Sequence, residues 1–165
     1  MTQTHTVPHR RAASALLAAA AAALQLVLTS AHHLYGAWRF DTPWRAHVAH
    51  IAMWLAILLA VSLAIWWRAS SAGVRRSAAW VFAATSLLAC GAWLGLFEGG
   101  YNHGLKAVLG LAGVNGPLFD LLFPPSIYEP PGDLVFEVSG VLQLPAGLVA
   151  GHFARAFLRG TRESN

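Results

Sequence analysis

The chain has 165 residues, of which 56% are hydrophobic and 11% are charged, and its formal net charge is +4. Soluble domains carry about 25% charged residues, so this composition excludes an ordinary soluble protein. With one cysteine the chain can form no disulfide within itself and no thiolate metal cluster.

Four charge-poor stretches, at residues 12–31, 51–67, 77–97 and 134–154, approach the roughly 20 apolar residues that cross a bilayer. A soluble chain this short could not bury four such helices. The sequence therefore predicts an all-α fold, a four-helix transmembrane bundle running up-down-up-down. We expect one membrane domain at residues 12–158, with helices at about 12–33, 44–67, 76–99 and 133–158.

The basic residues are distributed unequally between the two ends of these segments. Three lie at one end, namely Arg39, Arg45 and Lys106, and eight lie at the other, namely Arg10, Arg11, Arg68, Arg75, Arg76, Arg155, Arg159 and Arg162. The positive-inside rule then predicts cytoplasmic tails at residues 1–11 and 159–165. The pattern indicates an integral protein of a bacterial inner membrane, and it explains the basicity without nucleic-acid binding.

The first apolar segment is rich in alanine and is expected to remain as a helix that packs closely against its neighbours. The alternative is a signal peptide cleaved after Ala31. Cleavage would leave three spans and make His32 the new N-terminus.

The connection at residues 31–50 contains four of the eight histidines, and its Trp38 and Trp44 suit a membrane interface. His32 and His33 end the first segment, and because neighbours on a helix point about 100° apart, one of the two is expected to face water or headgroups. His47 and His50 begin the second segment. They are three residues apart, so both imidazoles should project from one face of the helix.

The third segment ends in Phe97-Glu98-Gly99-Gly100, with His103 shortly after. The glycines predict a helix end, either bent to aim side chains or an ordinary stop. Residues 105–132 follow, too apolar for a solvated loop and too broken for a fifth span. They predict an interfacial or re-entrant segment that acts as a lid, with Phe119 and Leu122 packed inward and Asp120 facing solvent or Lys106.

In the predicted topology every helix brings potential metal ligands to the outer face. Ionisable groups near hydrocarbon are costly and usually functional. Asp133 and Glu137, four apart, share a face of the fourth helix. We expect Glu98 and Glu137 to bridge a metal or to act as general base, and the predicted metal ligands are His32, His33, His47, His50, His103 and Asp133.

Imidazole and carboxylate ligands suit zinc, iron, manganese or copper(II), and haem is a less favoured cofactor. The interpretation is a small metalloenzyme, an oxidoreductase or metal-dependent hydrolase, acting on a lipid-soluble or interfacial substrate. A non-catalytic metal- or haem-carrying accessory subunit and a structural membrane subunit without cofactor are the alternatives. Membrane lipid is the expected environment, and a homo-oligomer or an accessory partner stays open.

Overall fold

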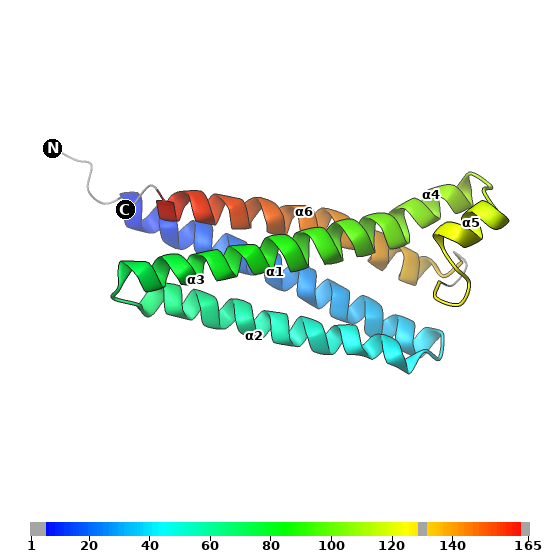
Figure 1. Ribbon diagram of the computed structural model, residues 1–165, viewed down its shortest axis with the longest axis horizontal. Coiled ribbons are helices and arrows are strands. Elements are labelled where there is room, and N and C mark those ends of the chain that lie inside the picture. The colour runs from blue at the N-terminus through cyan, green and yellow to red at the C-terminus, as the bar shows by residue number, and fades with distance from the viewer. Residues whose placement is uncertain (1–5, 129–131, 163–165) are drawn as a thin grey trace.

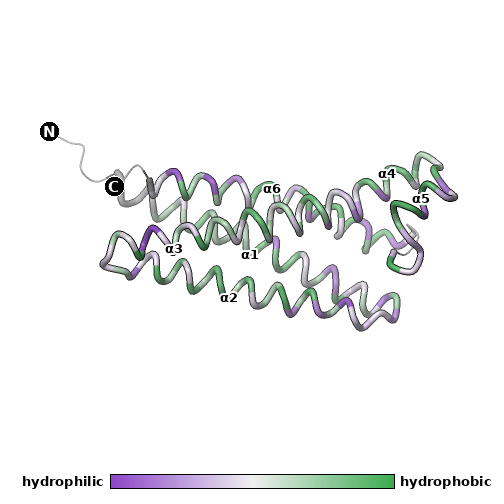
Figure 2. The backbone as a smooth tube through the Cα atoms, in the orientation of Figure 1, coloured by the Kyte–Doolittle hydropathy of each residue, from purple (hydrophilic) through white to green (hydrophobic). Residues whose placement is uncertain are grey.

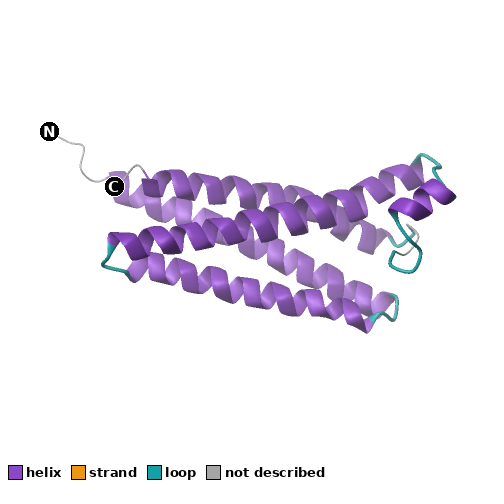
Figure 3. Ribbon diagram, viewed as in Figure 1, coloured by secondary structure: helices purple, strands orange, loops and turns teal. Residues whose placement is uncertain are grey.

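The computed structural model describes residues 6–128 and 132–162, and these residues form helices joined by short connections, with no strand among them (Figure 3). In chain order the elements are α1 (Thr6–Arg39), η1 (Pro43–Arg45), α2 (Ala46–Arg68), α3 (Ala72–Thr85), η2 (Ser86–Leu105), α4 (Lys106–Leu111), α5 (Pro117–Leu122) and α6 (Leu134–Arg162).

Four helical stretches are long and apolar enough to cross a membrane, namely Ala12–Arg39, Pro43–Arg68, Ala72–Leu111 and Leu134–Thr161. Hydrophobic residues occupy most of the length of these helices, and hydrophilic residues are concentrated where α3 begins (Figure 2). The start of α1, the end of α6 and the α2–α3 turn lie at one end of the molecule, while the α1–α2 connection, α4 and α5 lie at the other (Figure 1). The prediction of an all-helical chain with four membrane-spanning candidates is confirmed at this level.

The third helix does not end at its paired glycines, and that prediction is wrong. The chain continues from α3 through η2 into α4 without a break, and η2 has the wider turns of a π-helix. Such turns are rare and are frequent at functional sites. Glycine is used here for contact with α6, because a Cβ at position 99 would meet the Leu144 nitrogen and lie 2.9 Å from the Gln143 carbonyl carbon.

η2 and α6 pack backbone against backbone along much of their length. A Cβ at Gly147 would lie 2.5 Å from the Gly95 Cα, so both positions require glycine. Lipid tails are as apolar as the side chains of the helices, so burial of apolar surface does not drive helices together in a membrane. Close packing at small residues such as these does. The contact fixes η2 and α6 relative to each other, and ionisable side chains lie near the end of η2 and the start of α6.

The first helix extends to Arg39, well beyond the predicted end near residue 33. His32 and His33 are therefore helical residues, and both are buried, with 1% and 7% of their surface exposed. The expectation that one of the two faces water is wrong. Helix α1 packs against α6, α2 and η2, so two side chains about 100° apart can both point into the protein.

The α5 segment packs against the C-terminal end of η2. The Tyr101 hydroxyl donates a hydrogen bond to the Leu122 carbonyl oxygen (2.8 Å), and Phe123 is buried. Phe119 and Leu122 are partly buried while Asp120 is exposed, as expected. This contact brings the following residues, up to Tyr128, back over η2.

Candidate metal centre

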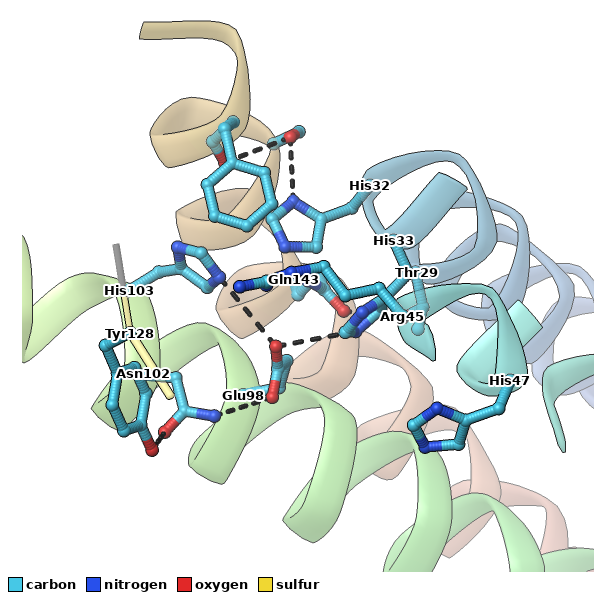
Figure 4. Close-up of polar contacts among 12 residues, drawn as sticks. Thr29, His32, His33, Arg45, His47, Glu98, Asn102, His103, Tyr128 and Gln143 are labelled. Atoms are coloured by element: carbon cyan, nitrogen blue, oxygen red, sulfur yellow. Dashed lines mark hydrogen bonds and ion pairs between the residues drawn. The ribbon is translucent and has the colours of Figure 1, made fainter. Parts of the chain in front are cut away.

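Glu98, on η2, lies at the centre of a buried polar cluster among the ends of α1, η2 and α6 (Figure 4). Its Oε1 lies 3.4 Å from His33 Nε2 and 3.8 Å from His103 Nε2. Its Oε2 accepts a hydrogen bond from Asn102 Nδ2 (2.7 Å), one turn further along. Asn102 Oδ1 in turn accepts one from the Tyr128 hydroxyl (2.9 Å). The carboxylate is thereby held with one oxygen aimed at imidazoles.

His103 is buried, with 3% of its surface exposed, and connects the two carboxylates. Its Nδ1 lies 3.2 Å from Glu137 Oε2 on α6. A carboxylate only accepts hydrogen bonds, so Nδ1 carries the proton in this contact, and in a neutral ring Nε2 then presents a lone pair. That lone pair faces the Glu98 oxygen. A carboxylate behind one nitrogen and a free lone pair on the other is the usual arrangement of a metal-binding histidine.

His32 has the same arrangement with a hydroxyl in place of the carboxylate. The Ser139 hydroxyl donates its single hydrogen to the Phe136 carbonyl oxygen (3.1 Å). His32 Nδ1, 2.9 Å from Ser139 Oγ, is therefore assigned as the donor. Its Nε2 is left with a lone pair, is buried and has no hydrogen-bond partner among the described residues. The His32 and His103 rings lie 4.5 Å apart between centroids.

Ligand atoms of His32, Glu98 and His103 all lie within 4.8 Å of one another. Two metal bonds of about 2.1 Å at a tetrahedral angle separate their ligand atoms by about 3.4 Å. Glu98 Oε1 lies 3.8 Å from His103 Nε2, close to this value. The group could therefore hold a metal ion after small side-chain rotations.

Two cations lie beside the cluster. Lys106 is 1% exposed, and its Nζ lies 2.9 Å from Glu137 Oε1. Arg45 is 7% exposed, its Nε donates to the Thr42 hydroxyl (2.9 Å), and it lies beside the cluster (Figure 4). Burial of a charge is costly unless it is paired. Lys106 compensates Glu137 directly, and sequence reasoning assigned neither cation to the cluster.

A buried polar ladder continues from the cluster toward the middle of the helices. Thr29 donates to Gln143 Oε1 (2.6 Å), and Gln25 Nε2 lies 3.4 Å from the Thr29 hydroxyl. All three side chains are fully buried. Sequence reasoning missed Gln25 and Thr29. Their spacing of four on α1 is the signal that could have found them.

The structure does not bring His47 and His50 to the cluster. Both are exposed, and His47 contacts the Trp44 carbonyl oxygen through Nδ1. Figure 4 shows His47 away from the other imidazoles. The buried face of α2 is marked by Val48, Ala52 and Leu59. At 100° per residue, His50 lies opposite this face, which is why the pair points outward.

Asp133 also lies outside the cluster, because other partners occupy its carboxylate. It accepts hydrogen bonds from the Phe136 backbone N–H (3.0 Å), from Arg39 Nε (2.8 Å) and from the Tyr35 hydroxyl (3.1 Å). The Phe136 N–H first, then the Arg39 and Tyr35 contacts, lower the pKa of Asp133 below its usual value. An ionised Asp133 caps α6 and ties it to the end of α1, which is a structural task.

The fold and site define a class: a helical chain with four candidate membrane spans and a buried cluster of histidine and glutamate between α1, η2 and α6. Comparison with known protein families, with curated proteins and with solved structures finds no match.

Proposed function

We propose that this chain is an integral membrane protein that binds a transition-metal ion at its outer end and uses it on a lipid-soluble substrate. The ligands are His32, Glu98 and His103, and His33 holds the Glu98 carboxylate. The observation that carries the proposal is the set of lone pairs facing one another: His32 Nε2 has no donor among the described residues, and His103 Nε2 faces a carboxylate. Such a group needs a cation at its centre.

The donor chemistry restricts the ion. Two imidazoles and a carboxylate suit zinc, iron, manganese or copper(II). Three protein ligands also leave a coordination position for water or substrate, as in catalytic zinc sites. Glu137, hydrogen-bonded to His103 at 3.2 Å, orients a ligand rather than binding the ion, and it is placed to hold a proton beside the centre.

The competing proposal is a structural network without metal. It is favoured by the ion pair of Glu137 with Lys106, and by the buried position of every histidine in the cluster. In that case a second proton on His103, at Nε2, takes the place of the metal ion beside Glu98, and the charged ring joins the two carboxylates. Metal analysis separates the two proposals.

We expect the purified full-length protein to contain one of the four metals in stoichiometric amount, measured by elemental analysis. His103→Ala removes a ligand and should reduce the metal content to background, whereas His50→Ala, an exposed imidazole on α2, should leave it unchanged. An absorption spectrum of the same sample would reveal haem. A metal-free protein, or equal metal content in both variants, would leave the structural network as the function of this cluster.

The proposal includes an orientation, with the helices running up-down-up-down across the membrane, both termini cytoplasmic and the α5 segment at the outer interface. Reporter fusions at Gly73, in the α2–α3 turn, and at Gly116, before α5, test it. We expect a cytoplasmic signal at Gly73 and an extracytoplasmic signal at Gly116, because eight of the eleven basic residues lie at the predicted inner end. The reverse pattern would place the metal site in the cytoplasm.

A further inference from the structure

A cavity of about 550 Å³ lies between α4 and the first half of α6, next to the candidate metal centre. This volume is within the range of about 300–1,000 Å³ that is usual for small-molecule sites. Its walls are mostly aliphatic, and they include Leu111, Leu134 and Val138. Two carboxylates, Asp133 and Glu137, complete the lining. An apolar cavity with a few polar groups is the form expected of a binding site for an organic ligand.

The cavity opens toward lipid. Leu111 and Leu134 are 90% and 77% exposed, and Val138 is 47% exposed. Exposed aliphatic side chains on a membrane helix face hydrocarbon chains. A ligand would therefore enter from the bilayer, so its body must be apolar.

The charges of the walls are already compensated. Asp133 is paired with Arg39 (2.8 Å) and Glu137 with Lys106 (2.9 Å). A cationic ligand would meet two nearby cations and gain little. Glu137 accepts one hydrogen bond on each oxygen, from Lys106 and His103, and a carboxylate can accept about four. The site therefore suits an uncharged ligand with a hydroxyl group that donates to Glu137.

Such a hydroxyl would lie one residue away from the candidate metal centre. Glu137 Oε2 is hydrogen-bonded to His103 Nδ1 (3.2 Å), and the opposite nitrogen of the same ring faces Glu98. The chain of contacts runs from the cavity through Glu137 and His103 to the cluster. It is a path along which a proton of the ligand could be held or moved.

We propose that this cavity binds an uncharged, lipid-soluble phenol or alcohol with an apolar tail, oriented by a hydrogen bond from its hydroxyl to Glu137. The role of this ligand as substrate of the metal centre rests on the proposed function. The binding site itself stands on the cavity, its compensated carboxylates and its opening to lipid.

The test uses 4-nonylphenol and its methyl ether, 4-nonylanisole, which share the apolar body but differ in the hydroxyl donor. Binding to the full chain in lipid nanodiscs is measured by equilibrium dialysis, with empty nanodiscs as the measure of partitioning into lipid. We expect saturable binding of the phenol and at least about tenfold weaker binding of the ether, since hydrogen bonds to charged groups are among the stronger ones. Equal binding of both compounds, or no saturable binding, would overturn the inference.

A cavity-filling variant locates the site. Val138→Trp places an indole in the cavity and should abolish saturable binding of the phenol. Val149→Trp is the matched control, because Val149 is a valine of α6 with similar exposure, 44% against 47%, and lies outside the lining of this cavity. If both variants bind the phenol like the unaltered chain, the ligand lies elsewhere and the inference is wrong.

The metal content of the same samples keeps the two proposals apart. Saturable phenol binding by a protein that never contains metal would support the cavity and overturn the metal proposal. Bound metal without saturable phenol binding would support the metal proposal and overturn the proposed ligand site in the cavity.

Discussion

Replacing Glu98 with glutamine should remove the metal while leaving the protein folded. Glutamine has the same shape, and its oxygen can still accept the hydrogen bond from Asn102 that Glu98 Oε2 accepts at 2.7 Å. Its amide group then points an N–H donor at His103 Nε2, which faces Glu98 Oε1 at 3.8 Å. The lone pair of His103 Nε2 is then satisfied without an ion, and the anionic ligand is lost.

The expected loss of metal affinity is at least about 100-fold, because removal of a mere outer partner of a metal ligand already costs about 10–100-fold. The measurement is metal titration of the metal-depleted protein, together with a thermal unfolding curve. Asp120→Asn is the matched control, the same carboxylate-to-amide change at an exposed position of α5. Unchanged metal affinity in Glu98→Gln would show that Glu98 is no ligand.

Much of the fold could be predicted from the sequence because a membrane span leaves a strong signal. Each of the four helices needs a long apolar stretch, and the helical stretches of the structure overlap all four predicted segments. The same signal gives the ends of the spans, so it placed His32, His33, Glu98, His103 and Glu137 at one end. What the structure adds is that these five side chains are in a connected set of contacts.

The uniformly apolar sequence of α2 made the helix easy to recognise but left its rotation about its own axis unpredictable. Nearly every residue of its span is apolar, so the pattern does not distinguish the face toward protein from the face toward lipid. The three-residue spacing of His47 and His50 is correct as a statement about a shared side of the helix. Only packing shows that the buried side carries Val48, Ala52 and Leu59 instead.

The paired glycines of the third segment were compatible with two different structures. Gly99 and Gly100 resemble a helix stop, because glycine is common where helices end. In a membrane it equally marks a position where two backbones touch, and the contact of Gly99 with Leu144 and Gln143 is of this kind. A single sequence does not separate these two uses of glycine, since the deciding neighbour is about 45 residues away along the chain.

Gly140→Ala should remove the metal although every proposed ligand remains in the chain. A Cβ at position 140 would overlap the His103 imidazole, coming to 2.5 Å from Cδ2. The backbones cannot separate to make room, because η2 and α6 are already in contact at Gly99 and at Gly95–Gly147. The ring must rotate, which breaks the Nδ1 contact with Glu137 and turns Nε2 away from Glu98. We expect a loss of metal content as complete as in His103→Ala.

Gly151→Ala is the control on the same helix. There the nearest atom to an added Cβ is Leu87 Cδ2 at 3.6 Å, an ordinary contact. Alanine is also better than glycine inside a helix by about 0.5–1 kcal/mol, so this variant should be at least as stable as the unaltered protein and keep its metal. If Gly140→Ala keeps its metal as well, His103 is not a ligand, because the Cβ added at position 140 and the His103 ring in its present position cannot occupy the same space. The metal would then have to be sought at the exposed pair His47 and His50, with the cluster around Glu98 serving to hold α1, η2 and α6 together.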